Sequence, residues 1–274
     1  VFLPQLVEWA GSMAVKDASF DGTIAYGLVP SKPGVLNVTR NGDGNETVAG
    51  TNIRLLLIDV KNLAFSGDAG NYNMSTRQSD GVFIDVASVA SVEPTFQPAA
   101  LSSVSVAFED PSSPPRAGQV GNLNVSFTLS NPLPADGKIR IEMPEEYCMK
   151  IDGNEACNSV TVESEDLDGT VSASFSNSVL IMERSGGSAN ALSQVSFNIS
   201  GITFPRLHGV SGSFAINTTL GNGVNIDVVA SATGPTVTGV GEKLTGVSLT
   251  LGNLVAGKNT NLEVNFTART DVFV

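Results

Sequence analysis

The chain repeats itself, and this feature constrains its fold more than any other. The segment Gly67–Val86 recurs as Gly209–Val228 at an offset of 142 (209 − 67). Both segments share glycines at three equivalent positions, alternating apolar residues and an Ile-Asp-Val triplet, all in one register. Self-similarity at a fixed offset is the sequence signature of repeated structural units. We therefore expect more than one copy of the same domain.

The similarity extends outward from these segments with small changes in loop length. Leu101–Val106 matches Leu244–Leu249 at an offset of 143 (244 − 101). Leu123–Thr128 matches Leu262–Thr267 at an offset of 139 (262 − 123). The repeat is therefore about 140 residues long, which is far above the period of a propeller blade or a β-helix coil.

The repeats divide the chain into three predicted parts. Residues 1–100 form a partial repeat that lacks its first strands, and residues 101–243 form a complete repeat. Residues 244–274 are the opening strands of a further repeat. Two explanations are open. The sequence is a window on a longer tandem array, or residues 244–274 of one subunit complete the 1–100 domain of a neighbouring subunit.

Apolar and polar residues alternate along most of the complete repeat. A period of two indicates strands with one buried and one solvated face. Gly, Pro, Asn and Asp mark the breaks between these strands. The positions expected in the core include Val104, Val106, Phe108, Leu123, Val125, Phe127, Ile139, Ile141, Val195, Phe197, Ile199, Phe214 and Ile216. Roughly eight to ten strands in such a repeat predict an all-β fold of tandem immunoglobulin-like antiparallel β-sandwiches.

The chain is acidic and poor in charged residues. Only 15% of its residues are charged, the formal net charge is −12 and the pI is about 4.4. Nucleic acids and anionic membrane surfaces both attract clustered Lys and Arg, so we expect neither partner. The longest apolar stretch, Ile53–Val60, contains Arg54 and Asp59 and is much shorter than the roughly 20 residues of a membrane span. The first nine residues lack the basic region of a signal peptide.

Two cysteines, Cys148 and Cys157, lie nine residues apart in a loop-like stretch. A disulfide across a short surface loop is typical of secreted proteins, and we predict one here. The alternative is a pair of free thiols in a reducing compartment. Two thiols without neighbouring ligands do not make a tetrahedral metal site.

The acceptor motif for N-linked glycans, Asn-x-Ser/Thr, occurs seven times. An Asn that alternates with inward-facing residues on a strand faces solvent and can carry a glycan. The alternative is a plain solvated Asn. The candidates are Asn37, Asn45, Asn73, Asn124, Asn198, Asn217 and Asn265. Together with the cysteines, they predict an extracellular or cell-surface glycoprotein.

Catalytic chemistry is scarce in this sequence. The single histidine, His208, lies in a predicted turn, where a solvated loop residue is expected. Most catalytic triads and catalytic zinc sites need a positioned histidine. The sequence also lacks phosphate-binding, dinucleotide-binding and nucleophile-elbow motifs. We therefore expect no enzymatic activity and no organic cofactor.

One acidic loop has the ligand spacing of a calcium site. Oxygen ligands occur at Asn41, Asp43 and Asn45, and Glu46 follows. Calcium loops place ligands at every second residue, but the bidentate Glu of an EF-hand is missing here. The loop is either a solvated acidic turn or a weak calcium site. The acidic run Glu163–Asp168 has the same two explanations.

The segment Asn131–Pro144 reads Asn-Pro-Leu-Pro-Ala-Asp-Gly-Lys-Ile-Arg-Ile-Glu-Met-Pro. It resembles a turn-plus-strand signature of repeat proteins in protists and algae. The chain also resembles large extracellular tandem-repeat proteins built of immunoglobulin-like β-sandwiches. This resemblance implies a role at a surface or in a fibre, and it supplies no catalytic residues.

These observations favour a structural building block of an extracellular filament or surface layer. It would self-associate head to tail through tandem or strand-complemented β-sandwich domains. The predicted intersubunit residues are Val247, Leu249, Leu251, Leu262, Val264 and Phe266. The alternatives are an adhesin or receptor ectodomain that binds a glycan or protein through its loops, and an accessory domain of a secreted hydrolase.

Overall fold

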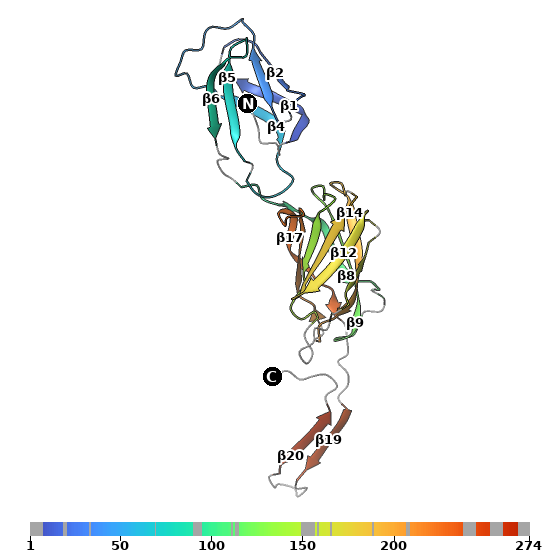
Figure 1. Cartoon of the computed structure of the whole chain (residues 1–274). Coiled ribbons are helices and arrows are strands. Elements are labelled where there is room, and N and C mark those ends of the chain that lie inside the picture. Colours follow the sequence, from blue (N-terminus) through green and yellow to red (C-terminus); the bar gives the residue numbers. More distant parts are fainter. Residues whose placement is uncertain are drawn as a thin grey trace. The chain divides into compact units, whose positions relative to one another are not determined.

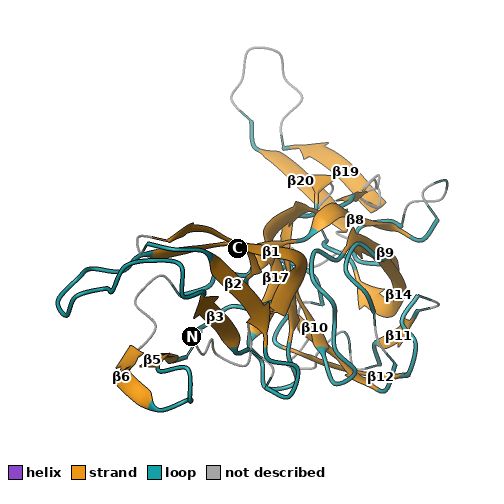
Figure 2. Cartoon of the chain, turned by 90° about the horizontal axis from the view of Figure 1, so that it is seen from above, coloured by secondary structure: helices purple, strands orange, loops and turns teal. Residues whose placement is uncertain are grey.

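The computed structural model of the chain describes residues 8–18, 21–32, 34–68, 70–89, 95–110, 112, 115–148, 157, 159–164, 166–187, 189–206, 209–237, 245–252 and 260–267. The described residues form strands and loops and contain no helix (Figure 2). It follows that none of these segments is a helix of the length and apolarity needed to cross a bilayer. The predicted all-β fold is confirmed.

The chain divides into two compact units. Unit 1 comprises Val1–Ala99 with Val224–Ile226, and unit 2 comprises Ala100–Gly223 with Asp227–Val274. This division places the segment after residue 243 in unit 2. The limits of the three parts predicted from the sequence, 1–100, 101–243 and 244–274, stay predictions.

Unit 2 contains a β-sandwich of two antiparallel sheets (Figure 1). One sheet has six strands in the order β12-β13-β10-β16-β17-β7, and the other has four in the order β11-β14-β9-β8. Their bounds are β7 (Ala99–Ala100), β8 (Ser102–Phe108), β9 (Val120–Thr128), β10 (Lys138–Glu142), β11 (Thr161–Glu163), β12 (Thr170–Ser176), β13 (Val179–Ser185), β14 (Gln194–Thr203), β16 (Ser213–Thr219) and β17 (Asn225–Thr233). The short strands β15 (Gly209–Val210) and β18 (Thr236–Val237) form a separate antiparallel pair.

The core of unit 2 consists of side chains predicted from the alternation. Leu123, Val125 and Phe127 of β9 are fully buried, and the residues between them are half-buried. Phe197 of β14 and Phe214 of β16 follow the same pattern. Burial of an apolar side chain of this size stabilises a fold by about 1.5–3 kcal/mol. The alternation of apolar residues in the sequence therefore produces the buried core that holds the two sheets together.

Edge-to-face ring contacts join the two sheets at one end of this core. Tyr147, which follows β10, contacts Phe214 at 5.2 Å and Phe204 at 6.0 Å between ring centroids. Phe204 in turn contacts Phe108 of β8 at 5.1 Å. The Tyr147 hydroxyl donates a hydrogen bond of 2.6 Å to Ser211 Oγ. Burial raises the pKa of Tyr147 to about 12.

The described part of unit 1 has three antiparallel strand pairs. They are β1 (Glu8–Ala18) with β4 (Leu55–Lys61), β2 (Ile24–Leu28) with β3 (Leu36–Arg40), and β5 (Tyr72–Arg77) with β6 (Phe83–Val89). Leu36 and Leu63 are buried, but most apolar side chains of β5 and β6 are exposed. Among the described residues, unit 1 thus has strands with little core between them.

The strand pairs of unit 1 match those of unit 2 in part. The β2–β3 pair has the register of β12–β13 throughout, and the β1–β4 pair has the register of β11–β14 at two adjacent pairs of residues. The matching pairs of opposite residues are Val15–Leu57 with Val162–Ile199, and Ile24–Arg40 with Val171–Arg184. Around β5 and β16 the backbone also agrees, since Gly70 and Gly212 both have φ of 82°. Only glycine adopts such a φ without strain, which explains why both positions are glycine.

A residue in the left-handed region interrupts β4 and β14 at the same place. Asp59 of β4 has φ of 58°, and Gly201, its counterpart in the repeat, has φ of 81°. In β14 the register with β9 shifts between Ile199 and Ile202, and in β4 a shift in the register with β1 spans Asp59. Asp is one of the few residues other than glycine that tolerates the left-handed region. The left-handed backbone is therefore present in both units, at different residue types.

Candidate functional site

The strongest candidate for a functional surface is the pair of strands β19 (Thr245–Leu251) and β20 (Leu262–Thr267) (Figure 1). The strands run antiparallel, with Leu249 opposite Val264 and Leu251 opposite Leu262. Opposite residues, and residues two apart along a strand, share one face of a sheet. The polar face carries Ser248, Thr250, Glu263 and Asn265. The apolar face carries Val247, Leu249, Leu251, Leu262, Val264 and Phe266.

This apolar face is uncovered in the part of the chain that the structure describes. Its six side chains are 48–66% exposed. Apolar surface of this extent on a soluble protein marks a contact site. A two-stranded sheet by itself is also marginal in water, because it has no second layer against which to bury its apolar face. The β19–β20 pair therefore has the properties of a sheet fragment that needs a partner.

The β19–β20 pair has a buried counterpart within unit 2. Val106 lies opposite Val125 in β8–β9, as Leu249 lies opposite Val264 in β19–β20. Five of the six apolar counterparts are at most 7% exposed; the sixth, Val104, is half-buried. The same strand geometry is thus a core element in one place and an open surface in the other.

The irregularity of the two strand pairs also agrees. Each pair has a register shift near the start of its first strand. Ser103 in β8 and Gly246 in β19 occupy that place, with φ of 49° and 62°. Because a bulge depends on the local backbone, its recurrence shows that the likeness reaches the hydrogen-bonded ladder.

Unit 1 exposes apolar residues of the first repeat at positions that are buried in the second repeat. Three of its side chains are 44–59% exposed, whereas their counterparts in the second repeat are at most 1% exposed. The pairs are Ile53 with Val195, Met74 with Ile216, and Ile84 with Ile226. Val195 lies opposite Phe127 of β9, Ile216 lies opposite Ile141 of β10, and β9 also pairs with β8. The described part of unit 1 contains no counterparts of those three strands.

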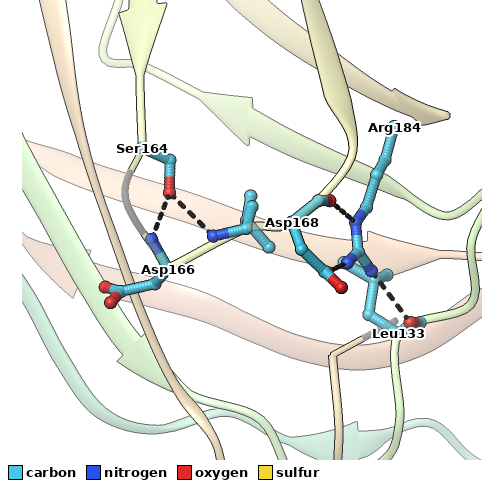
Figure 3. Close-up of polar contacts among 6 residues, drawn as sticks. Leu133, Ser164, Asp166, Asp168 and Arg184 are labelled. Atoms are coloured by element: carbon cyan, nitrogen blue, oxygen red, sulfur yellow. Dashed lines mark hydrogen bonds and ion pairs between the residues drawn. The ribbon is translucent and has the colours of Figure 1, made fainter. Parts of the chain in front are cut away.

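A buried arginine organises the acidic run that the sequence left open (Figure 3). Arg184 of β13 donates from Nε to the carbonyl of Asp168 at 2.9 Å and from Nη1 to the carbonyl of Leu133 at 3.2 Å. Its Nη2 also forms an ion pair with the Asp168 carboxylate. Burial lowers the pKa of Arg184. Asp168 thus fastens the loop before β12 to β13.

The neighbouring acid Asp166 is also engaged. Its carboxylate accepts hydrogen bonds from Ser196 N at 2.8 Å and from Ser196 Oγ at 2.5 Å. The backbone N–H groups of Asp166 and Leu167 donate to Ser164 Oγ at 3.3 Å (Figure 3). The carboxylates of Asp166 and Asp168 therefore both bind other residues of the fold, Ser196 and Arg184.

The predicted calcium residues lie in a loop with its own hydrogen bonds. Asp43 Oδ1 accepts from Thr23 N at 2.8 Å, and its Oδ2 accepts from Thr23 Oγ1. Asp21 Oδ2 accepts from Asn45 N at 3.1 Å and Nδ2 at 2.7 Å. These hydrogen bonds lower the pKa of both carboxyls. The largest effect on Asp43 comes from the Thr23 hydroxyl, and the largest effect on Asp21 comes from the Asn45 backbone N–H. Asn41 and Glu46 are exposed.

Within the described ranges, no three residues among His, Cys, Asp and Glu lie close enough to hold a metal ion. The carboxylates of Asp43 and Asp21 have hydrogen-bond donors of the protein itself as partners. Calcium binding there stays a prediction. His208 lies outside the described residues.

Cys148 and Cys157 form a disulfide, with 5.3 Å between their Cα atoms. Both cysteines are buried. The backbone of Thr203 holds them, because its carbonyl accepts from Cys148 N at 3.0 Å and its N–H donates to Cys157 Sγ at 3.2 Å. The bridge therefore closes a loop between β10 and β11, and the hydrogen bonds to Thr203 tie this loop to the end of β14.

The seven sequons differ in exposure. Asn37, Asn45, Asn73 and Asn265 are exposed, while Asn124, Asn198 and Asn217 are half-buried. Asn124 Nδ2, the atom that would carry a glycan, donates to Asn198 Oδ1 at 2.8 Å. Glycosylation at these positions stays a prediction.

Asp227 is a fully buried carboxylate that the sequence analysis did not single out. Its Oδ2 accepts from the backbone N–H groups of Ser130 and Asn131, both at 3.0 Å, and its Oδ1 accepts from Asn131 Nδ2 at 2.8 Å. The recurring Ile-Asp-Val triplet was the available signal, because an acid kept between two apolar residues in both repeats is unusual on a solvated strand.

Comparisons with known proteins identify no family for this chain. No protein-family model matches the chain, and no curated protein sequence matches it. One solved structure that it resembles is the Corynebacterium diphtheriae major pilin SpaA, whose structure points to a modular pilus assembly with stabilizing isopeptide bonds. The match has 17% identity and a TM-score of 0.27, and it covers 66% of this chain and 42% of the pilin chain. A likeness at this TM-score carries no argument about function.

Proposed function

We propose that the chain is a structural building block of an extracellular filament or surface layer. Copies of the chain assemble head to tail as subunits. The β19–β20 pair of one subunit completes a sheet of the next subunit by strand addition. The observation that carries this proposal is the uncovered apolar face of β19–β20, whose counterpart in β8–β9 is buried in a core.

The physical argument rests on what the two surfaces lack. The β19–β20 pair has an apolar face without a second layer, and the described part of unit 1 has apolar residues without the strands that cover their counterparts. Each apolar side chain that becomes buried contributes about 1.5–3 kcal/mol before the cost of association. Exposed sheet edges pair readily with other strands. The β19–β20 pair and unit 1 therefore both offer a surface suited to strand pairing.

The resulting contact is heterologous, because different parts of the chain meet in it. A head-to-tail contact of this kind produces an open chain of subunits unless the rotation between them closes a ring. An extracellular location fits this role. The Cys148–Cys157 disulfide supports it, since such bonds persist in oxidising compartments, and we include N-linked glycans in the proposal.

The proposal is tested by sedimentation velocity and negative-stain microscopy of the chain over a range of concentrations. We expect the average mass to rise with concentration. The double variant Leu249→Asp with Val264→Asp should stay monomeric, because it places charges on the apolar face. The matched control is Ser248→Asp with Thr250→Asp, which changes the polar face of the same pair and should assemble as the unchanged chain does.

A chain that stays monomeric at every concentration contradicts the proposal. So does an apolar-face variant that assembles as well as its control. Circular dichroism of each variant shows whether the sandwich of unit 2 is retained.

A further inference from the structure

Strand β4 of unit 1 is the structural counterpart of β14. Two adjacent pairs of opposite residues in β1–β4 match two in β11–β14, among them Val15–Leu57 and Val162–Ile199, and Asp59 and Gly201 both have a left-handed backbone. The two strands differ at their other edge. In unit 2 that edge of β14 pairs with β9, whereas among the described residues β4 pairs with β1 alone.

Strand β20 is the structural counterpart of β9. It pairs with β19 as β9 pairs with β8, including the position of the bulge. In the sheet order β11-β14-β9-β8, the strand that lies against β14 is β9, and β8 lies on the outer edge. Transferred to the counterparts, this order becomes β1-β4-β20-β19.

We infer that β20 pairs antiparallel with the open edge of β4 in a second copy of this chain. The register follows from unit 2, where Phe197 lies opposite Val125, Ile199 opposite Leu123, and Val195 opposite Phe127. The counterpart pairs are Leu55 with Val264, Leu57 with Leu262, and Ile53 with Phe266. The inference rests on the proposed function and adds to it the acceptor strand and the register.

The side chains that meet in this register are compatible. The three inward pairs are apolar on both strands, so the β19–β20 face becomes continuous with the half-buried face of β4. On the outward face, Arg54 lies opposite Asn265 and diagonal to Glu263, which brings opposite charges together. A slip by one residue would turn the apolar face of β20 to solvent.

The test uses oxidative crosslinking between two preparations of the full chain. Each preparation has one added cysteine: one carries Arg54→Cys and the other carries Asn265→Cys, both on the solvated face of the proposed sheet. The matched control replaces the second by Thr250→Cys. That residue is on the same face of the same strand pair, but on β19, which is one strand further from β4. The native Cys148–Cys157 disulfide is kept in all preparations.

We expect the mixture with Asn265→Cys to yield several-fold more crosslinked dimer than the mixture with Thr250→Cys. Equal yields, or a higher yield with Thr250→Cys, overturn the register. If the subunits still assemble in that case, the proposed function stands. A single chain carrying both Arg54→Cys and Asn265→Cys that closes its crosslink as a monomer, with no mixed dimer, overturns the second copy as the partner. Absence of assembly in every preparation refutes both the inference and the proposed function.

Discussion

The backbone N–H of Asp227 donates a hydrogen bond of 3.0 Å to Thr218 Oγ1, and the backbone N–H of Asp85 donates one of 3.1 Å to Thr76 Oγ1. The two acids are related by the offset of the repeat (227 − 85) and occupy the same place in their units. Their carboxylates have different surroundings. That of Asp227 is buried against the loop before β10, whereas Asp85 is exposed and accepts from Thr76 Oγ1 at 2.8 Å.

This difference makes Asp85 a matched control for Asp227. We predict that Asp227→Ala lowers the free energy of unfolding by about 3 kcal/mol, because the N–H groups of Ser130 and Asn131 lose a charged acceptor in a buried place. Asp85→Ala should cost less than about 1 kcal/mol, since water replaces the carboxylate. Urea unfolding followed by circular dichroism measures both. Equal losses would show that the loop before β10 does not depend on Asp227.

The guanidinium of Arg184 should be irreplaceable by an ammonium. Arg184→Lys removes the planar set of donors that reaches Asp168 and Leu133 together, and we expect a loss of about 1.5–3 kcal/mol in the free energy of unfolding. The control is Arg140→Lys, because Arg140 forms an exposed ion pair with Glu142. Such pairs contribute about 0–1 kcal/mol. Thermal unfolding of both variants tests the difference, and similar midpoints would contradict it.

Tyr147 should make stability fall at alkaline pH. Burial raises its pKa from the ordinary 10.0 to about 12, so folding favours the neutral phenol. The contribution of this group is therefore complete below pH 10 and is lost as the pH rises from 10 through about 12. An ultraviolet titration should show a phenolate step near pH 12 that Tyr147→Phe abolishes. A step that persists in Tyr147→Phe belongs to another group and refutes this assignment.

The disulfide should stabilise unit 2 by restricting its unfolded chain. For the loop between Cys148 and Cys157 we expect a contribution of about 2–3 kcal/mol. Unfolding in urea with and without a reductant measures it, and the double variant Cys148→Ser with Cys157→Ser should match the reduced chain. Reductant should leave the double variant unchanged. An unfolding midpoint that does not move on reduction would mean that the loop is held by other contacts, such as those to Thr203.

Much of the fold could be predicted because burial follows the sequence period. Leu123, Val125 and Phe127 alternate with polar residues, and they lie in the core as expected. The pairing of β19 with β20 also follows from the likeness of Leu262–Thr267 to a strand of unit 2. The role of these two strands between subunits stays a prediction.

Other features could not be predicted, for identifiable reasons. The described part of the repeat contains three very short strands, β11, β15 and β18, which bring its strand number above the predicted eight to ten. Strands of two or three residues show no period. The buried states of Arg184 and Asp227 depend on loops that lie far away in the sequence. The sheet order likewise results from pairings between distant segments, which local alternation does not specify.

The left-handed backbone at Asp59 limits where a strand can dock on β4. Alternation of side chains forbids a shift by one residue, but a shift by two would keep every apolar residue on the same face. The left-handed residue interrupts the ladder of β4, so a strand shifted by two would lose its hydrogen bonds at that point. Each joint in a fibre built this way would then have the same length. The axial spacing between subunits would be set by a single backbone torsion.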